Sequence, residues 1–140
     1  MMGSTFQSDI PGNLFEIVEN VASVASNAVD TAYQPIFRVP QAGTLKAARW
    51  FASASQNTDA TDYRTLKIVN LGAAAAGTVV LASHAFSATK AANVPVSMTN
   101  NTTAANLALA AGDVLAYVTA STGNGVAIIA AQVQIEYQKD

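Results

Sequence analysis

The segment Gln132-Val133-Gln134-Ile135-Glu136-Tyr137-Gln138 decides the fold class of this chain. Its three apolar residues alternate strictly with four polar ones. Successive side chains of a β-strand point to opposite faces of a sheet, so this pattern predicts a strand with one face buried and the other in water. The cleanest periodicity in the sequence is therefore that of a β-strand rather than of a helix.

The chain upstream of this strand, from about residue 31, reads as short β-prone runs separated by turn clusters, which is typical of a sandwich or a barrel. The other expected strands cover residues 33–39, 44–54, 63–71, 78–86, 94–98, 107–109 and 114–119. The pair at 63–86 predicts a hairpin with a long loop, and Pro95 predicts an edge position. We therefore predict one all-β domain over residues 31–140, a single antiparallel β-sandwich of about eight strands, jelly-roll-like in arrangement.

Residues 1–30 differ in kind, because they are polar as far as Asn13 and largely apolar or small beyond it. One helical face would contain Leu14, Val18, Val21, Ala25 and Ala28, but the alternation of valine with serine fits a strand equally well. The first dozen residues lack the apolar content to fold alone. We predict that residues 1–30 form an N-terminal arm, ordered by contact with a partner or a neighbouring copy.

The charge content is low, since Asp, Glu, Lys and Arg make up 11% of the chain, against about 25% in a typical soluble domain. The folded surface must then be covered largely by small and uncharged polar residues. Alanine is a poor strand former, yet it recurs inside almost every expected strand. Small side chains permit close contact between sheets or subunits, and a compositional bias of the source organism explains the pattern equally well.

Several partners and compartments are disfavoured by composition. A net charge of −2 gives no attraction to a phosphate backbone or an anionic membrane, so we expect neither nucleic acid nor membrane as a partner. No stretch approaches the ~18 strongly apolar residues of a transmembrane helix. The chain has no cysteine, and its start has neither a basic segment nor an apolar run of signal-peptide length. We expect synthesis in the cytoplasm without a signal peptide.

The sequence contains few residues that could form a catalytic or metal site. The single histidine, His84, lies in the middle of an expected strand, and a side chain packed in the sheet is favoured there over a general base or a metal ligand. Asp59 and Asp62 belong to an oxygen-rich loop that could hold Ca²⁺, together with Asn57, Thr58 and Thr61. The loop lacks the ligand number and glycine placement of an EF-hand, so a solvated turn is favoured.

Three further patterns are partial matches to functional motifs. The segment 72–78 has the glycine spacing of a phosphate-binding loop, but Thr78 stands where the lysine is required. Asn100 and Asn101 begin glycosylation sequons, which we interpret as hairpin residues. Trp50 and Phe51 could form a sugar-stacking platform, although core positions are favoured for large aromatics in a sandwich. We predict no catalytic, cofactor-binding or metal-ligating residue, and hence no enzyme.

Three segments carry a resemblance to a known family: Asp62-Tyr63-Arg64-Thr65-Leu66-Lys67-Ile68-Val69-Asn70-Leu71-Gly72, Gly77-Thr78-Val79-Val80-Leu81-Ala82 and Leu107-Ala108-Leu109-Ala110-Ala111-Gly112-Asp113-Val114-Leu115. Over about residues 31–138 the chain resembles the small β-sandwich decoration (cement) proteins of tailed bacteriophages. The resemblance implies a virion protein on the capsid surface, with the major capsid protein as partner and a homotrimer on local threefold axes. It implies no individual site residue.

One rival function uses the same fold, namely a receptor- or carbohydrate-binding knob of a phage tail fibre. Exposure of Trp50, Tyr63 or Tyr117 in a cleft of polar groups would favour it. An enzyme would require an acid within hydrogen-bond reach of His84. The sequence alone does not separate a capsid position from a tail position.

Overall fold

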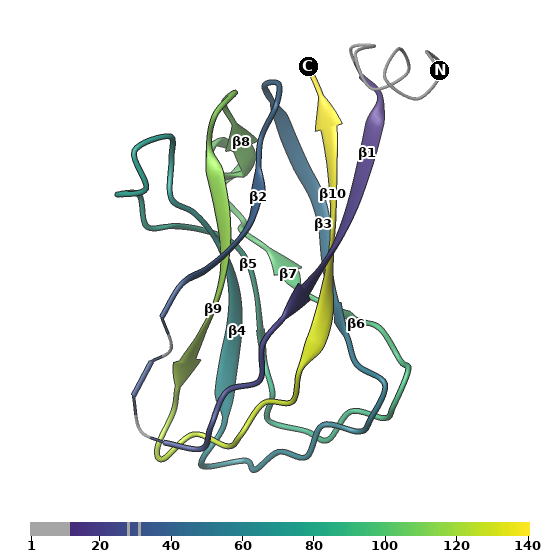
Figure 1. Ribbon diagram of the computed structural model, residues 1–140, viewed down its shortest axis with the longest axis vertical. Helices are drawn as coiled ribbons and strands as arrows, with labels where there is room; N and C mark the ends of the chain where they lie inside the picture. The colour runs from purple at the N-terminus through teal and green to yellow at the C-terminus, as the bar shows by residue number, and fades with distance from the viewer. Residues whose placement is uncertain (1–11, 28, 31) are drawn as a thin grey trace.

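Two antiparallel sheets lie face to face in the computed structural model, which describes residues 12–27, 29–30 and 32–140 (Figure 1). The sheet that we call the β3 sheet contains β1 (Leu14–Val21), β10 (Ala131–Lys139), β3 (Gly43–Phe51), β6 (Val96–Ser97) and β8 (Ala108–Leu109). The β4 sheet contains β2 (Gln34–Arg38), β9 (Val114–Ser121), β4 (Arg64–Asn70), β5 (Val79–Ala85) and β7 (Thr99–Asn100). One 3₁₀ turn, η1 (Ala104–Leu107), precedes β8. The predicted all-β sandwich is confirmed.

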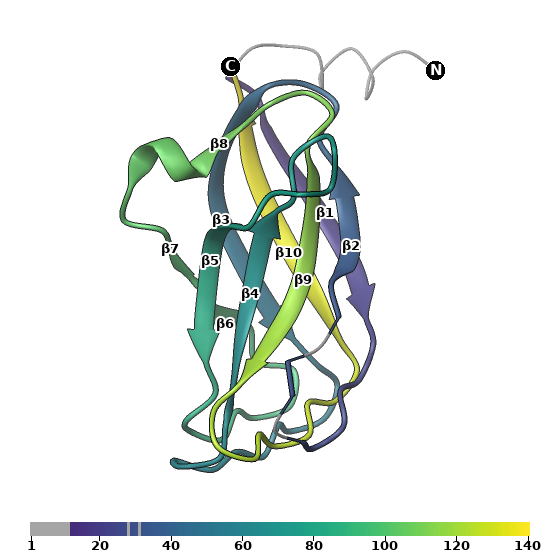
Figure 2. The same ribbon diagram turned by 90° about the vertical axis from the view of Figure 1, so that its left-hand side faces the viewer.

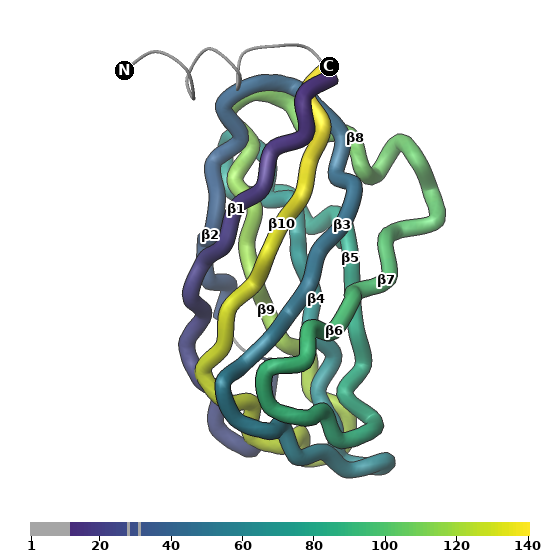
Figure 3. Tube along the Cα trace, turned by 90° about the vertical axis from the view of Figure 1, so that its right-hand side faces the viewer, coloured from purple at the N-terminus to yellow at the C-terminus, as the bar shows by residue number. Residues whose placement is uncertain are grey.

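The strand order is that of a jelly roll. β6 and β8 both pair with β3, near its opposite ends, and together they act as one interrupted strand. Among the eight principal strands, the first then pairs with the last (β1 with β10), the second with the seventh (β2 with β9), the third with the sixth and the fourth with the fifth (β4 with β5). This is one long antiparallel hairpin wrapped into two sheets, seen from its two faces in Figures 2 and 3.

The core lies between the sheets and follows the alternation of the last strand. Val133, Ile135 and Tyr137 are 1%, 1% and 0% exposed, while Gln132 on the opposite face of the strand is exposed. Trp50 packs against Phe86 with an edge-to-face contact of 4.8 Å between ring centroids. The register predicted for β10 is therefore confirmed.

Arg64, the first residue of β4, is completely buried. Its guanidinium donates to six acceptor atoms: the carbonyl oxygens of Ala25, Asn27, Val29 and Val126, Asn27 Oδ1 and Thr119 Oγ1, at 2.7–3.2 Å. Within the described residues no carboxylate forms an ion pair with it. Arg64 thus ties the connection between β1 and β2 to the body of the fold through dipoles alone.

The first strand corrects the expected domain boundary. β1 pairs with β10 along all eight of its residues, and the Phe15 ring lies 5.6 Å from that of Tyr137. Of the two structures that the sequence allows after Asn13, a helix or a strand, residues Leu14–Val21 form the strand. The prediction of a separate arm over residues 1–30 is therefore wrong for Leu14–Val21, which belong to the sandwich. Residues 1–11 of the predicted arm lie outside the described residues.

Candidate interaction surfaces

The outer face of the β4 sheet carries Thr65 and Lys67 and, beside them, an apolar cluster whose members are largely buried within the protomer. Alternation places Val69, Ala116 and Val118 on this face, opposite the core residues Ile68 and Tyr117. They form a second hydrophobic cluster with Leu71, against which Val80 and Val114 pack. A sheet whose outer face simply met water would place polar side chains at these positions. The β4 sheet therefore has an apolar layer on each side.

A groove of about 330 Å³ crosses this face, and we call it the β4-sheet groove. It is lined by Asp30, Tyr33, Lys67, Val69, Thr78, Val80, Val118 and Ala120. Tyr33 at its rim is 48% exposed. Asp30 Oδ1 accepts a hydrogen bond from the Ser121 amide at 2.9 Å, whereas Lys67 has no ion-pair partner among the described residues. An apolar floor with a polar rim is the anatomy of a protein interface.

The outer face of the β3 sheet is polar and includes a pair of carboxyl groups. Glu16 lies directly opposite Glu136 across β1 and β10, and Glu136 Oε2 lies 3.2 Å from Arg49 Nη1. The hydrogen bond between the two carboxyl groups raises the pKa of Glu16 and lowers that of Glu136. When one proton is bound to this pair, it is therefore bound to Glu16, and Glu136 is the partner ionised beside Arg49.

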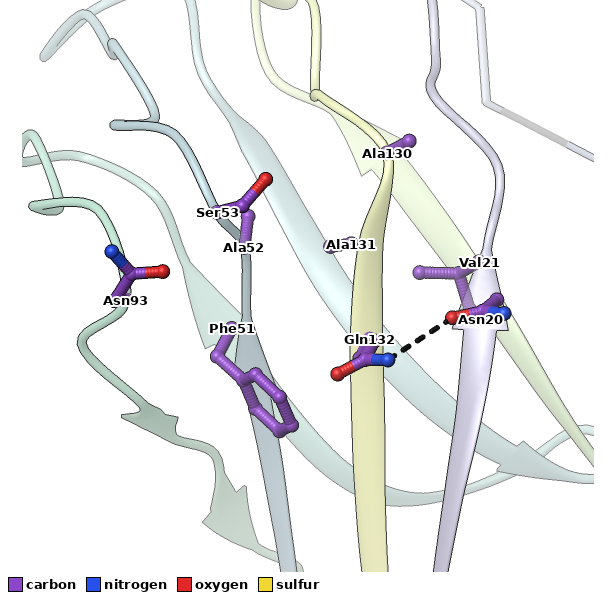
Figure 4. A pocket seen from close by; sticks show the side chains of 9 residues that line it. All are labelled: Asn20, Val21, Phe51, Ala52, Ser53, Asn93, Ala130, Ala131 and Gln132. Carbon is purple, nitrogen blue, oxygen red and sulfur yellow. Dashed lines mark hydrogen bonds between the residues drawn. The ribbon is translucent and has the colours of Figure 1, made fainter.

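A second concavity, the Phe51 pocket, lies on the same polar face (Figure 4). Its volume is about 470 Å³, and its lining is Asn20, Val21, Phe51, Ala52, Ser53, Asn93, Ala130, Ala131 and Gln132. Asn20, Gln132 and Phe51 form one row across β1, β10 and β3. Gln132 Nε2 donates to Asn20 Oδ1 at 3.3 Å.

His84 lies in β5 of the β4 sheet and packs against residues of the core. It pairs with the core residue Leu66 across β4 and β5, and its ring meets the Phe86 ring edge-on at 5.0 Å. Burial, with a smaller contribution from the positive charge of Lys90, lowers the pKa of His84. No carboxylate of the described residues hydrogen-bonds to it. The imidazole is therefore neutral at neutral pH.

The carboxylates of the oxygen-rich loop, Asp59 and Asp62, accept hydrogen bonds that stabilise turns. Asp59 Oδ1 accepts hydrogen bonds from Thr61 Oγ1 and Thr61 N, both at 2.7 Å, and from Asp62 N at 3.0 Å. These bonds, that of the Thr61 hydroxyl foremost, lower the pKa of Asp59 to about 2. Asp62 Oδ1 instead accepts from the Asn124 amide at 2.8 Å. The turn interpretation matches this geometry, and no group of three potential metal-ligating His, Cys, Asp or Glu residues occurs among the described residues.

The two asparagines of the sequons and the glycine-spaced segment 72–78 both belong to the framework of the fold. Asn100 and Asn101 donate through their side-chain amides to the carbonyl oxygens of Lys46 and Val80. The segment 72–78 is a turn followed by β5 and not by a helix. No helix of the described residues is long and apolar enough to cross a membrane.

Of the aromatic residues that would signal a binding cleft, two are core. Trp50 is 1% and Tyr117 0% exposed, and Tyr63 is half-buried outside both concavities. Phe51 follows Trp50 in β3 and points to the opposite face, into its pocket. The period of two in a strand predicts this split, because neighbouring residues cannot both face the core.

Comparison with known proteins adds little to this geometry. No protein-family profile and no characterised protein sequence matches the chain. Among solved structures, "Structure of infectious bursal disease virus Gx strain" aligns at 11% identity with a TM-score of 0.32. The alignment covers 89% of this chain and 32% of the viral chain, so this chain spans about a third of that length. A likeness this weak says nothing about function.

Proposed function

We propose that this chain is a structural protein of a virus particle, a decoration protein that binds the exterior of a tailed-phage capsid and stabilises the shell. The observation that carries the proposal is the β4-sheet groove on the outer face of a jelly roll, because its apolar floor and polar rim suit contact with another protein. Jelly rolls occur in viral capsids, lectins and cupins, so the fold by itself does not choose among them. The resemblance to decoration proteins adds support, because residues 62–72 and 77–82 lie largely in β4 and β5 of this sheet.

The proposed mechanism is mass action. A protein that binds the assembled shell, but not separated capsid subunits, stabilises the shell by the binding free energy of each bound copy. Many copies on one particle add their contributions. Such a protein needs a stable scaffold and an adhesive surface, and it needs no reactive group.

We assign the β4-sheet groove to contact between copies of this chain in a homotrimer. Interfaces between identical subunits are more apolar than transient ones, as is the floor of this groove. Its rim carries one acid, Asp30, and one base, Lys67. A threefold interface is heterologous, so the groove of one copy meets a different surface of the next copy, and that surface can offer an opposite charge to Asp30 and to Lys67.

Two substitutions of matched exposure test this assignment. Tyr33, at the groove, is 48% exposed, and Val18, on β1 of the other sheet, is 49% exposed. Tyr33→Glu should dissociate the trimer, because it buries a charge in the interface, while Val18→Glu should leave the trimer intact. Light scattering at micromolar concentration measures both. A wild-type species at the monomer mass of 14.4 kDa, or a trimer unaffected by Tyr33→Glu, contradicts the assignment.

Particle binding tests the proposed function itself. The protein should co-sediment with intact virions and with empty capsids in a fixed stoichiometry, and it should raise the temperature at which the shell opens. Binding to isolated tails but not to capsids would move the protein to the tail and refute the decoration role.

A further inference from the structure

We propose that the Phe51 pocket binds a neutral saccharide through one or two pyranose rings. This inference is independent of the decoration role and of the β4-sheet groove, because the pocket lies on the outer face of the other sheet. Its volume of about 470 Å³ falls within the range of small-molecule sites, about 300–1,000 Å³.

An aromatic ring with amides on both sides defines the pocket. Phe51 is half-buried and lies on the outer face of β3, since its neighbour Trp50 faces the core. In Figure 4 the Phe51 ring lies between Gln132 of β10 and Asn93 of the loop before β6, with Ser53 farther along the chain from β3. Small or aliphatic residues complete the lining, namely Val21, Ala52, Ala130 and Ala131. Val21, Ala52 and Ala131 belong to the core cluster and are at most 8% exposed, so they fill little of the concavity. A ring-shaped ligand can therefore lie close to the sheet.

The amide groups are positioned by the backbone and keep free hydrogen-bonding capacity. Asn93 adopts a left-handed conformation with φ of 62°, and its backbone N–H donates to the Ala52 carbonyl at 2.8 Å. No hydrogen bond from the side chains of Asn93 or Ser53 occurs to a described residue. Asn20 and Gln132 share one hydrogen bond, which leaves Asn20 Nδ2 as a donor and Gln132 Oε1 as an acceptor.

These groups match the chemistry of a sugar ring. A pyranose has an apolar face of C–H groups, which packs on an aromatic ring, and a rim of hydroxyls that both donate and accept hydrogen bonds. Side-chain amides also do both, so pairs of hydroxyls suit Asn20, Gln132 and Asn93. An entirely apolar ligand would leave these amides unpaired, at a cost in affinity.

The absence of charge in the lining selects a neutral ligand. None of the nine lining residues is ionisable. The nearest cation along β3 is Arg49, two residues before Phe51, and its guanidinium already contacts Glu136 and Gln134. An anionic sugar would therefore gain no ion pair at this site.

The test is amide chemical-shift mapping of the full-length protein with a panel of neutral sugars at high millimolar concentration. The panel contains the methyl glycosides of glucose, galactose, mannose and N-acetylglucosamine, together with maltose, lactose and cellobiose. At least one sugar should shift amides of β3, β10 and the loop around Asn93. Phe51→Leu, which keeps an apolar side chain but removes the ring, should raise its Kd by about two- to tenfold.

Two variants of β10 provide a matched pair. Gln132→Ala should weaken sugar binding, whereas Gln134→Ala, two residues along on the same face and outside the pocket, should not. The proposal is overturned if no sugar of the panel shifts pocket amides, if the shifts survive Phe51→Leu unchanged, or if both glutamine variants act alike. Unfolded variants are recognised by loss of amide dispersion, and Phe51→Tyr, which keeps the ring, should then retain binding.

Discussion

Arg64 offers the sharpest test of the forces that hold this fold together. Arg64→Met keeps most of the apolar stem and removes the guanidinium that donates to six acceptor atoms. A buried acceptor left without a partner costs about 1–3 kcal/mol. Removing a buried cation also removes its desolvation penalty, which offsets part of that loss.

We expect Arg64→Met to lower the free energy of unfolding by about 2–4 kcal/mol, since two or more of the freed carbonyl groups stay inaccessible to water. At about 3 °C per kcal/mol for a domain of this size, Tm should fall by about 6–12 °C. The free energy of unfolding of Arg64→Lys should lie between those of wild type and Arg64→Met, because an ammonium has three donors for these acceptors. Hydrogen exchange should speed up first around Asn27 and Val126, whose carbonyl groups Arg64 holds.

Urea and thermal unfolding at one fixed protein concentration measure these effects, since self-association makes Tm depend on concentration. Arg49→Met is the control, because Arg49 forms a partly exposed ion pair with Glu136 and pairs of this kind contribute about 0–1 kcal/mol. If Arg64→Met were as stable as wild type, the guanidinium would contribute nothing beyond an apolar side chain, and the reasoning would be refuted.

Three further predictions concern the core, pH and the first strand. Ile135→Ala should cost about 2–5 kcal/mol by leaving a cavity, while Gln134→Ala on the outer face should cost under about 0.5 kcal/mol, measured by urea unfolding; similar effects would contradict the register. Burial and the charge of Lys90 lower the pKa of His84 in the folded protein. As the pH drops below neutral, the imidazole of His84 is therefore protonated in the unfolded chain before it is protonated in the folded chain. Stability should therefore fall as pH drops through about 6.5, and His84→Asn should flatten this slope in unfolding curves; an unchanged slope would assign the effect to other groups. Deleting residues 1–30 should prevent folding, because it removes β1 and uncovers one edge of β10; a cooperatively folded truncation product in circular dichroism would restore a separable arm.

Local periodicity in the sequence determined most of the fold. Each strand from β2 to β10, except the two-residue β7, lies within or overlaps a run predicted from β-prone residues and turn clusters. The hairpin of β4 and β5, the edge position next to Pro95 and the buried face of β10 were all predicted correctly. These features depend on the alternation of side chains and on turn residues, which act within a few positions along the chain.

Pairing between distant segments decided the rest. The pattern of β1 fits a helix as well as a strand, and it becomes a strand because β10, more than a hundred residues later, offers a paired edge. The expected strand at 94–98 instead leaves the β3 sheet at Met98 and continues as β7 in the β4 sheet. Arg64 is indistinguishable in sequence from a surface arginine, and only the convergence of Ala25, Asn27 and Val126 buries it. The β4-sheet groove and the Phe51 pocket likewise join residues from several strands and loops. Such sites depend on which strands become neighbours, and that is fixed by the burial of the whole core rather than by any local stretch of residues.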